Sequence, residues 1–452
     1  MNFKYIFFIL TIISMTSCSS LINETKKESI SFDAKKITLS NGLTVISVKN
    51  TKLPIFSYYT YYKVGGKYEE AGITGASHLL EHMMFKGAKK YGPGEFDRLV
   101  EGNGGKNNAY TTNDLTVYYE SLPKEHFLKI VDLEADRMEN LSLGEESFEN
   151  ERNVVLEERK MRYENSDQGK IYLQMMKEMF KGTPYGTSVI GTIPDLKSVT
   201  RDQIYNYFKK FYAPNNAVII IVGDLNHSEV QTAIKQRFAK IPKTKNLEII
   251  KKEILAKKDF NFKSKFNREV HLKGSSPNPL FNLSFKSVKV GTHDGFVLDI
   301  LASILSDGGS SYLTQNFVLS KKPKLSQVYA GNHTLMNSGV FYIFGQALPG
   351  IKPAEIKKDL LVSLQRACNE AITEVNLKKI KNQYMVSMLD GLDTNAGIAR
   401  FLGDHEVYYG SYKDYDRIMD IYEGITVSEV KDSCKKFLKK ENSIFLSIWN
   451  KN

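Results

Sequence analysis

The apolar residues near the start of the chain alternate between the two-residue period of strands and the 3.6-residue period of helices. Two short strands, residues 37–39 and 43–48, flank Asn41-Gly42, a dipeptide typical of hairpin turns. Residues 55–64 form a third strand, rich in aromatic side chains. The next elements expected are a helix around His78 that Gly87 closes, a short helix at 96–100, one bent strand or a pair of strands at 109–119, and amphipathic helices at 125–141 and 145–165.

The later part of the chain repeats the pattern of the earlier part. Residues 199–211 read as a capped helix that runs into a strand at 218–222, and residues 425–437 run in the same way into 444–448. The same offset, 226 residues, relates three pairs of residues: Thr200 and Thr426, Phe211 and Phe437, and Asn216 and Asn442. This repeat indicates a duplicated domain.

The length and charge of the chain narrow its class. With 452 residues it exceeds what one compact core supports, so two or more domains are expected. Its 42% hydrophobic and 25% charged residues are ordinary for a soluble globular protein. The net charge of +11 is compatible with an acidic partner or a membrane surface. Basic runs such as Lys321-Lys322-Pro323-Lys324 contain no interleaved aromatics, so we expect no nucleic-acid partner.

The N-terminus has the pattern of a targeting segment. Lys4 precedes an almost wholly apolar run at 5–15, which is too short to span a bilayer. Small residues then lead to Cys18 and resemble a bacterial lipobox, although Met15 stands where leucine is more usual. We expect Cys18 to be acylated and the protein to be an exported lipoprotein, anchored to a membrane in the periplasm or at the cell surface, with the outer membrane favoured. The alternative is an ordinary secretory signal with a chance cysteine.

The two remaining cysteines, Cys368 and Cys434, lie in helix-like stretches far apart in the sequence. A disulfide is possible in an oxidising compartment, and two buried free thiols fit the pattern equally well. Neither cysteine has the spacing of a metal-binding motif.

The stretch His78-Leu-Leu-Glu-His82 carries the clearest chemical signal. On one helix, His78 and His82 lie one turn apart, with Glu81 beside them. Two imidazoles at this spacing can hold one zinc ion, and the carboxylate can accept a proton from a metal-activated water. The order His-x-x-Glu-His is the inverted zinc-protease motif. By itself the string also occurs by chance, as a pair of core or surface histidines.

A third ligand is expected in the helix at 145–165. Four of its residues recur at the spacing of one helix face: Glu151, Val154, Val155 and Glu158. Two carboxylates on an apolar, core-facing surface cost free energy unless a positive group compensates them, and a metal ion would do so. Glu157 points away from this face. The alternative is a surface helix whose carboxylates pair with its arginines, Arg152, Arg159 and Arg162.

Together these residues resemble the pitrilysin-type metallopeptidases, the family of insulin-degrading enzyme and the mitochondrial processing peptidase. The match comprises His78, Glu81 and His82, then the stretch 151–158, in which Glu158 follows His82 by 76 residues, a gap that the family shares. The edge-strand motif of the family is matched by residues 104–118, including Asn108 and Ala109, and a later motif by 212–217 with Gly223 and Asp224. The resemblance covers most of residues 37–225.

The resemblance implies a zinc-dependent endopeptidase that holds one Zn²⁺ per chain. It assigns His78, His82 and Glu158 as the zinc ligands and Glu81 as the catalytic base. Glu151 would support one of the ligands. The strand at Asn108-Ala109 would receive a peptide substrate as an added β-strand.

The second copy lacks the equivalent groups. A rough register places Ile300, Ser303 and Ile304 where the first copy has its histidines and glutamate, so the second copy cannot hold the metal. In the family, the following segment carries an arginine and a tyrosine seven residues apart that contact the substrate, but residues 317–325 contain no such pair. Half-size members of the family often work as dimers. We therefore expect a heterodimer whose homologous partner supplies the pair, and we favour a homodimer less.

The duplication and the resemblance predict an α+β fold of two duplicated α/β-roll domains, each an antiparallel-rich mixed sheet flanked by helices. The expected segments are a signal peptide at 1–17, a tether at 18–33, a zinc-binding catalytic domain at 34–240, a linker at 241–265 and a non-metal-binding copy at 266–452. Two other function classes compete. One is a catalytically silent structural or binding subunit, as occurs in the family, and the other is a zinc-storage protein.

Overall fold

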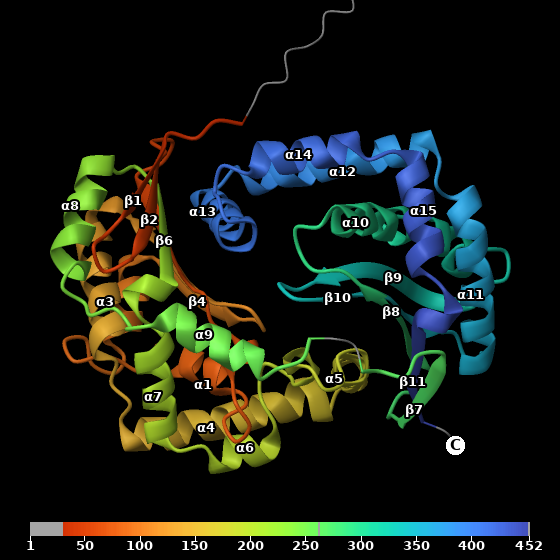
Figure 1. The fold of residues 1–452 in the computed structure, drawn as a ribbon, viewed down its shortest axis with the longest axis horizontal. Coiled ribbons are helices and arrows are strands. Elements are labelled where there is room, and N and C mark those ends of the chain that lie inside the picture. Colours follow the sequence, from red (N-terminus) through yellow and green to blue (C-terminus); the bar gives the residue numbers. More distant parts are fainter. Residues whose placement is uncertain (1–29, 261–262, 451–452) are drawn as a thin grey trace, which may run out of the picture. The chain divides into compact units, whose positions relative to one another are not determined.

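The computed structural model describes residues 30–260 and 263–450 (Figure 1). Its first sheet has six strands. The strand order is β1-β2-β6-β3-β5-β4, and every neighbouring pair is antiparallel except β2 and β6, which are parallel. The predicted hairpin at Asn41-Gly42 joins β1 to β2. The alternating pattern at 109–119 belongs to a pair of strands rather than one bent strand. The strands are β1 Ala34–Thr38, β2 Thr44–Lys49, β3 Ile55–Tyr62, β4 Lys106–Thr111, β5 Thr116–Pro123 and β6 Ala217–Gly223.

The second sheet repeats the topology of the first without a counterpart of β1. Its order is β7-β11-β8-β10-β9, with one parallel pair, β7 and β11, in the place of β2 and β6. The duplication inferred from the sequence offset is therefore confirmed, as is the mixed α+β class. The strands are β7 Arg268–Lys273, β8 Leu280–Ser287, β9 Leu325–Thr334, β10 Gly339–Ala347 and β11 Ser443–Trp449.

Helices flank both sheets (Figure 1), and α7 and α15 occupy corresponding positions in the two halves. The predicted caps of α7 and α15 are both capping boxes, with Thr200 and Gln203 in one and Thr426 and Glu429 in the other. The helices of the first half are α1 Ala76–Met83, α2 Glu95–Val100, α3 Phe127–Asn140, α4 Glu145–Arg159, α5 Asp167–Met179, α6 Ile193–Ser198, α7 Arg201–Phe211, α8 His227–Phe238 and α9 Leu247–Ala256. Those of the second half are α10 His293–Ser306, α11 Pro353–Glu370, α12 Glu374–Gly391, α13 Asn395–Asp404, α14 Tyr415–Gly424 and α15 Val427–Phe437.

Each half of the chain covers part of the sheet of the other half. Helix α5 packs against β8 and β11, where Ile171 and Met175 join the core of the second sheet. Helix α13 packs against β3 and β6, where Ile398 and Leu402 join the core of the first sheet. The two cores are therefore completed reciprocally, by helices that are far from them in sequence.

The region predicted as a linker contains a helix. Leu247 and Ile254 of α9 are buried in the hydrophobic cluster on the face of the first sheet opposite α13. Lys251 donates hydrogen bonds from Nζ to the Lys63 carbonyl at 3.1 Å and to Asn216 Oδ1 at 3.1 Å. The domain boundaries at 240 and 265 stay a prediction.

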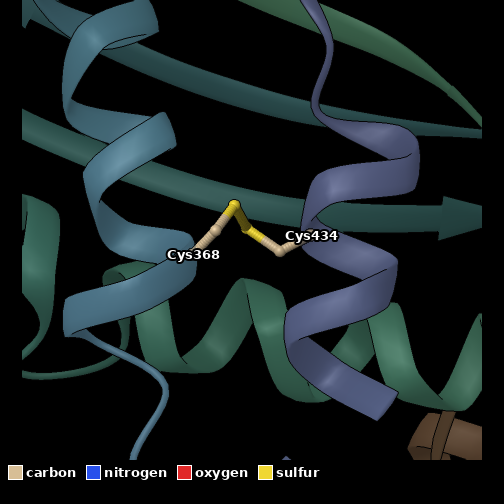
Figure 2. Close-up of a disulfide and its surroundings, with 2 residues drawn as sticks. All are labelled: Cys368 and Cys434. Atoms are coloured by element: carbon tan, nitrogen blue, oxygen red, sulfur yellow. A yellow bond between two sulfur atoms is a disulfide. The ribbon is translucent and has the colours of Figure 1, made fainter. Parts of the chain in front are cut away.

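A disulfide joins Cys368 of α11 to Cys434 of α15, as Figure 2 shows. The two Cα atoms lie 5.5 Å apart although the residues are 66 positions apart in the chain. Both residues are buried in the hydrophobic cluster on the face of the second sheet opposite α5. The sequence left open a disulfide or two buried free thiols, and the structure has the disulfide.

The predicted signal peptide and Cys18 lie outside the described residues. Within 30–260 and 263–450, we find no helix that combines the length and the apolar character needed to cross a membrane.

Candidate metal and active site

Helix α1 presents the predicted motif toward α4. Its N-cap residue is Gly75, whose φ of +91° favours glycine, and its Leu79, Leu80 and Met83 are fully buried. With these residues in the core, the other face of the helix carries both histidines of the motif. Helices α1 and α4 pack directly against each other.

Helix α4 meets α1 with a narrower face than the sequence predicts. Val155 is completely buried and Glu151 is 8% exposed, but Val154 is 48% exposed. The expectation that Val154 belongs to the core-facing surface is therefore wrong. At 100° per residue, Val154 lies well to one side of the line through Glu151 and Val155, and only a wide interface would have covered it.

Three side chains converge between these helices as the sequence predicts. Ligand atoms of His78, His82 and Glu158 all lie within 4.8 Å of one another. Glu158 Oε2 is 3.7 Å from His78 Nε2 and 3.3 Å from His82 Nε2. Among the described residues, no other group of three histidine, cysteine or acidic side chains is placed to share a metal ion.

The atoms of this group fit a zinc ion. Glu158 Oε2 is buried and has no well-directed hydrogen bond from any described side chain, so a carboxylate oxygen is left available inside the protein. Burial, with His82 nearby, lowers the pKa of His78 to about 4, which keeps its imidazole neutral as a metal ligand must be. Two imidazoles and one carboxylate are the donor set of catalytic zinc sites.

Charged side chains surround the three candidate metal ligands, and Glu151 is one of them. Glu151 Oε2 lies 3.2 Å from His82 Nδ1, while its other oxygen lies 2.7 Å from Lys86 Nζ. Burial acts to lower the pKa of His82, but the carboxylates of Glu158 and Glu151 outweigh it and raise that pKa. A carboxylate behind a histidine fixes the orientation of the ring.

Glu158 is held from its other side as well. Arg162, one helical turn further along, lies with Nε 3.1 Å from Glu158 Oε1. His82 beside the carboxylate keeps the pKa of Glu158 below its usual value. The alternative expectation of arginine pairing holds for all three arginines, since Arg152 also pairs with Glu149 and Arg159 with Glu164. The carboxylate that Arg162 contacts, however, also faces the two histidines.

Glu81 contacts the edge strand of the first sheet. Thr111 of β4 donates a hydrogen bond from Oγ1 to Glu81 Oε2. Burial raises the pKa of Glu81, and the Thr111 hydrogen bond opposes that rise. A carboxylate with a raised pKa beside these candidate metal ligands suits a general base that works near neutral pH.

Strand β4 offers a free edge beside this carboxylate. Asn108 pairs with Tyr119 and Ala109 with Tyr118 of β5, and no other described strand pairs with β4. Asn108 is exposed and Ala109 is half-buried. An unpaired strand edge can accept an extended peptide through main-chain hydrogen bonds.

Within residues 263–450, no comparable group of metal-ligating side chains is found. Helix α10 places Ile300, Ser303 and Ile304 along one side, and both isoleucines are buried in the core of the second sheet. Residues 317–325 contain neither arginine nor tyrosine.

Two contacts of the site were not predicted from the sequence. Lys86 follows His82 by four residues, a spacing that predicts the two side chains on the same side of the chain. The bond from Thr111 to Glu81 had no local signal, because it joins a strand to a helix 30 residues away.

The chain is similar to known metallopeptidases along most of its length. The description "Insulinase (Peptidase family M16)" matches residues 44–193, and "Peptidase M16 inactive domain" matches residues 198–384. The zinc protease PqqE of Helicobacter pylori is 31% identical over 381 residues, which cover 82% of this chain and 83% of that protein. The probable mitochondrial-processing peptidase subunit beta of Arabidopsis thaliana is 24% identical, over 90% of this chain and 76% of that one.

Solved structures show the same fold. The crystal structure of a protease from Helicobacter pylori matches with a TM-score of 0.84 and 27% identity, over 92% of this chain and 100% of that chain. A peptidase M16 inactive domain from Pseudomonas fluorescens matches with a TM-score of 0.82 and 20% identity, over 93% of this chain and 98% of that chain. The second likeness concerns the fold alone.

Proposed function

The chain belongs to the M16 family of metallopeptidases, and on this premise we propose that it is a zinc-dependent endopeptidase acting on peptides or small unfolded polypeptides. One observation carries the proposal. His78, His82 and Glu158 converge within 4.8 Å, and Glu81 lies beside them in contact with a free strand edge.

The proposed zinc ligands are His78, His82 and Glu158. A bound zinc ion would polarise the scissile carbonyl and acidify a water molecule. Glu151 orients the ring of His82 from behind, and Lys86 in turn fixes Glu151.

Glu81 moves the proton in this proposal. Its carboxylate accepts a proton from the attacking water and returns it to the leaving amine. Thr111 holds Oε2 of Glu81, so the base is kept next to the strand that receives the substrate. Asn108 and Ala109 on that strand bind the peptide through their backbone, which selects an extended shape more than particular side chains.

The test replaces Glu81 by glutamine in protein purified from its native cell, together with its natural partners. We expect Glu81→Gln to keep one zinc ion per chain and to slow cleavage of an unstructured peptide by roughly 10²- to 10⁴-fold. Glu157→Gln, an exposed change on α4, serves as the control and should leave both quantities unchanged. Cleavage by Glu81→Gln at the wild-type rate would refute the assigned base.

We further propose that the active form is a heterodimer. Residues 317–325 lack the arginine and tyrosine that substrate contact requires in the family, so a homologous subunit would supply them. The purified chain alone should be nearly inactive, and adding the homologous subunit should restore turnover. Robust cleavage by the single chain would contradict this.

We also propose that acylation of Cys18 anchors the protein to a membrane. Mass spectrometry of the detergent-extracted protein should then find Cys18 as the N-terminal residue with attached acyl chains. A mature chain that begins at another residue would contradict the lipid anchor.

A catalytically silent binding subunit is the second candidate, since the family description that matches residues 198–384 is that of an inactive domain. That match lies outside the part of the chain that carries His78 and His82. Zinc binding without peptide cleavage, in the presence of the partner, would favour this candidate.

A further inference from the structure

The N-terminus of α1 is held by a carboxylate from outside the helix. Glu69 accepts a hydrogen bond from the Gly75 N–H at 2.7 Å with Oε2 and one from the Ser77 N–H at 2.8 Å with Oε1. The side chain of Glu69 is buried. It lies six residues before the cap residue, so it is outside the helix. It is also not one of the proposed zinc ligands.

This arrangement replaces the usual cap. The first N–H groups of a helix lack partners inside the helix, and a serine, threonine, asparagine or aspartate at the cap normally satisfies one of them. Here the cap residue is Gly75, which has no side chain for this purpose. Glycine is required at this position because its φ is +91° and a Cβ would lie 2.6 Å from the Ile190 carbonyl oxygen. Glu69 therefore provides the acceptors that the cap residue cannot. Burial raises the pKa of Glu69 to about 7, and the ionised form of its carboxyl suits the positive end of the helix.

Glu69 is itself fixed by its surroundings. Lys258, just beyond α9, donates from Nζ to the Lys67 carbonyl at 2.8 Å and also to the Glu69 carbonyl. On the helix side, Ser77 Oγ and Tyr207 OH of α7 are hydrogen-bonded at 2.9 Å. The contact between Glu69 and α1 thus joins two rigid parts of the first half.

The position of this contact bears on the metal group. Ser77, whose N–H Glu69 binds, immediately precedes His78, and His82 follows one turn later on the same short helix. Glu158 stands on a different helix, so the three ligand atoms meet only if α1 keeps its position along its own axis relative to α4. One residue of helix corresponds to 1.5 Å along the axis, so a slip of even part of that step would spoil a site whose bonds are about 2 Å long.

We propose that Glu69 is a positioning residue for the zinc site, which sets the axial position of α1 so that His78 and His82 meet Glu158. The inference rests on the proposed function. It predicts that loss of the carboxylate weakens zinc binding although no ligand is changed.

The test compares Glu69→Gln with Glu70→Gln, an exposed neighbour that serves as the matched control. Glutamine keeps the size but offers a donor in place of one acceptor, so one N–H of α1 loses its partner. We expect at least a tenfold weaker affinity for zinc in Glu69→Gln, measured by competition with a chelator. Its metal-free form should show faster amide exchange at the start of α1. In zinc-saturated enzyme, kcat should fall with little change in KM. Glu70→Gln should match wild type in every measurement.

A second pair of variants covers the case in which Glu69→Gln fails to fold. Lys258→Met removes the support behind Glu69 from a half-buried position, and Lys257→Met changes its exposed neighbour. Lys258→Met should weaken zinc binding in the same direction by a few-fold, and Lys257→Met should not. Wild-type zinc affinity in Glu69→Gln, or in Lys258→Met if the first variant is unfolded, would overturn the inference. Absence of zinc binding by the wild-type chain would instead overturn the proposed function.

Discussion

Thr111 and Glu81 show how one hydroxyl group can tune a base. Burial disfavours the charged form of Glu81 and raises its pKa, while the Thr111 hydrogen bond stabilises the carboxylate and limits that rise. A general base works only when it is ionised, so activity should be lost as the pH falls through this pKa.

Replacing Thr111 by valine should therefore raise the pKa of Glu81 further. We expect the acidic limb of the pH–rate profile to move to higher pH. On that limb kcat/KM should fall roughly tenfold, since a hydrogen bond to a charged group contributes about 1.5–3 kcal/mol. Thr111→Ser retains the hydroxyl and is the control. An unchanged acidic limb in Thr111→Val would show that the bond does not act on the base.

Helix α4 shows how narrow the contact surface of an element can be. Val154 and Val155 are adjacent in sequence, yet one is 48% exposed and the other completely buried. Period alone placed both on the inner face, because a hydrophobic residue on a helix flank is compatible with a wide or a narrow contact. The width was set by the helix that α4 meets.

Val155→Ala should accordingly destabilise the protein by about 2 kcal/mol, through lost burial and the cavity left behind. Val154→Ala should stay within about 0.5 kcal/mol of wild type. Urea unfolding of the metal-free proteins measures both. Equal effects of the two substitutions would contradict the orientation of α4.

The disulfide is the covalent link between two elements of the second half. It joins α11 to α15 across a 66-residue separation, so its removal frees a long loop in the unfolded chain. The double variant Cys368→Ser/Cys434→Ser should lose about 3–4 kcal/mol of stability. Wild-type protein in a reducing agent should unfold like the variant, and the variant should not respond to the reducing agent. If reduction of the disulfide did not lower the stability of the wild-type protein, this expectation would be wrong.

At the scale of the whole molecule, the exchange of α5 and α13 ties the halves together. The first sheet needs Ile398 and Leu402 of α13 to cover it, and the apolar side of α5 needs the second sheet. A duplicated sequence does not imply two independent folding units when each copy lends a helix to the other.

A fragment of residues 34–240 should therefore not behave as a folded domain. It would leave Ile46, Tyr59 and Ile220 of the first sheet without α13, and it would expose Ile171 and Met175 of α5. We expect the fragment to aggregate or to unfold without a cooperative transition, whereas the full chain should show a sharp one. A monomeric fragment with cooperative thermal unfolding would contradict this.

Much of the architecture could be predicted from local pattern. The hairpin at Asn41-Gly42, both capping boxes and the 226-residue repeat depend on neighbouring residues or on direct comparison within the chain. The two histidines and Glu81 share one short helix, so their proximity followed from helical geometry alone. Glu158 was reached through the resemblance to a family, since spacing on α4 by itself left a surface helix as an equal alternative.

Sequence by itself thus determined many elements of the first half, the duplication and the identity of the chemical groups on α1, because these depend on interactions within a few residues or on repeated pattern. Tertiary structure decided the rest. It brought Glu158 and Thr111 to the histidine helix, paired Cys368 with Cys434, exposed Val154, exchanged α5 and α13, and set Glu69 on the end of α1. The physical reason is shared by all of these. Each depends on contacts between segments that only the packed sheets and helices bring together, and no local pattern encodes which partner a face or a carboxylate will meet.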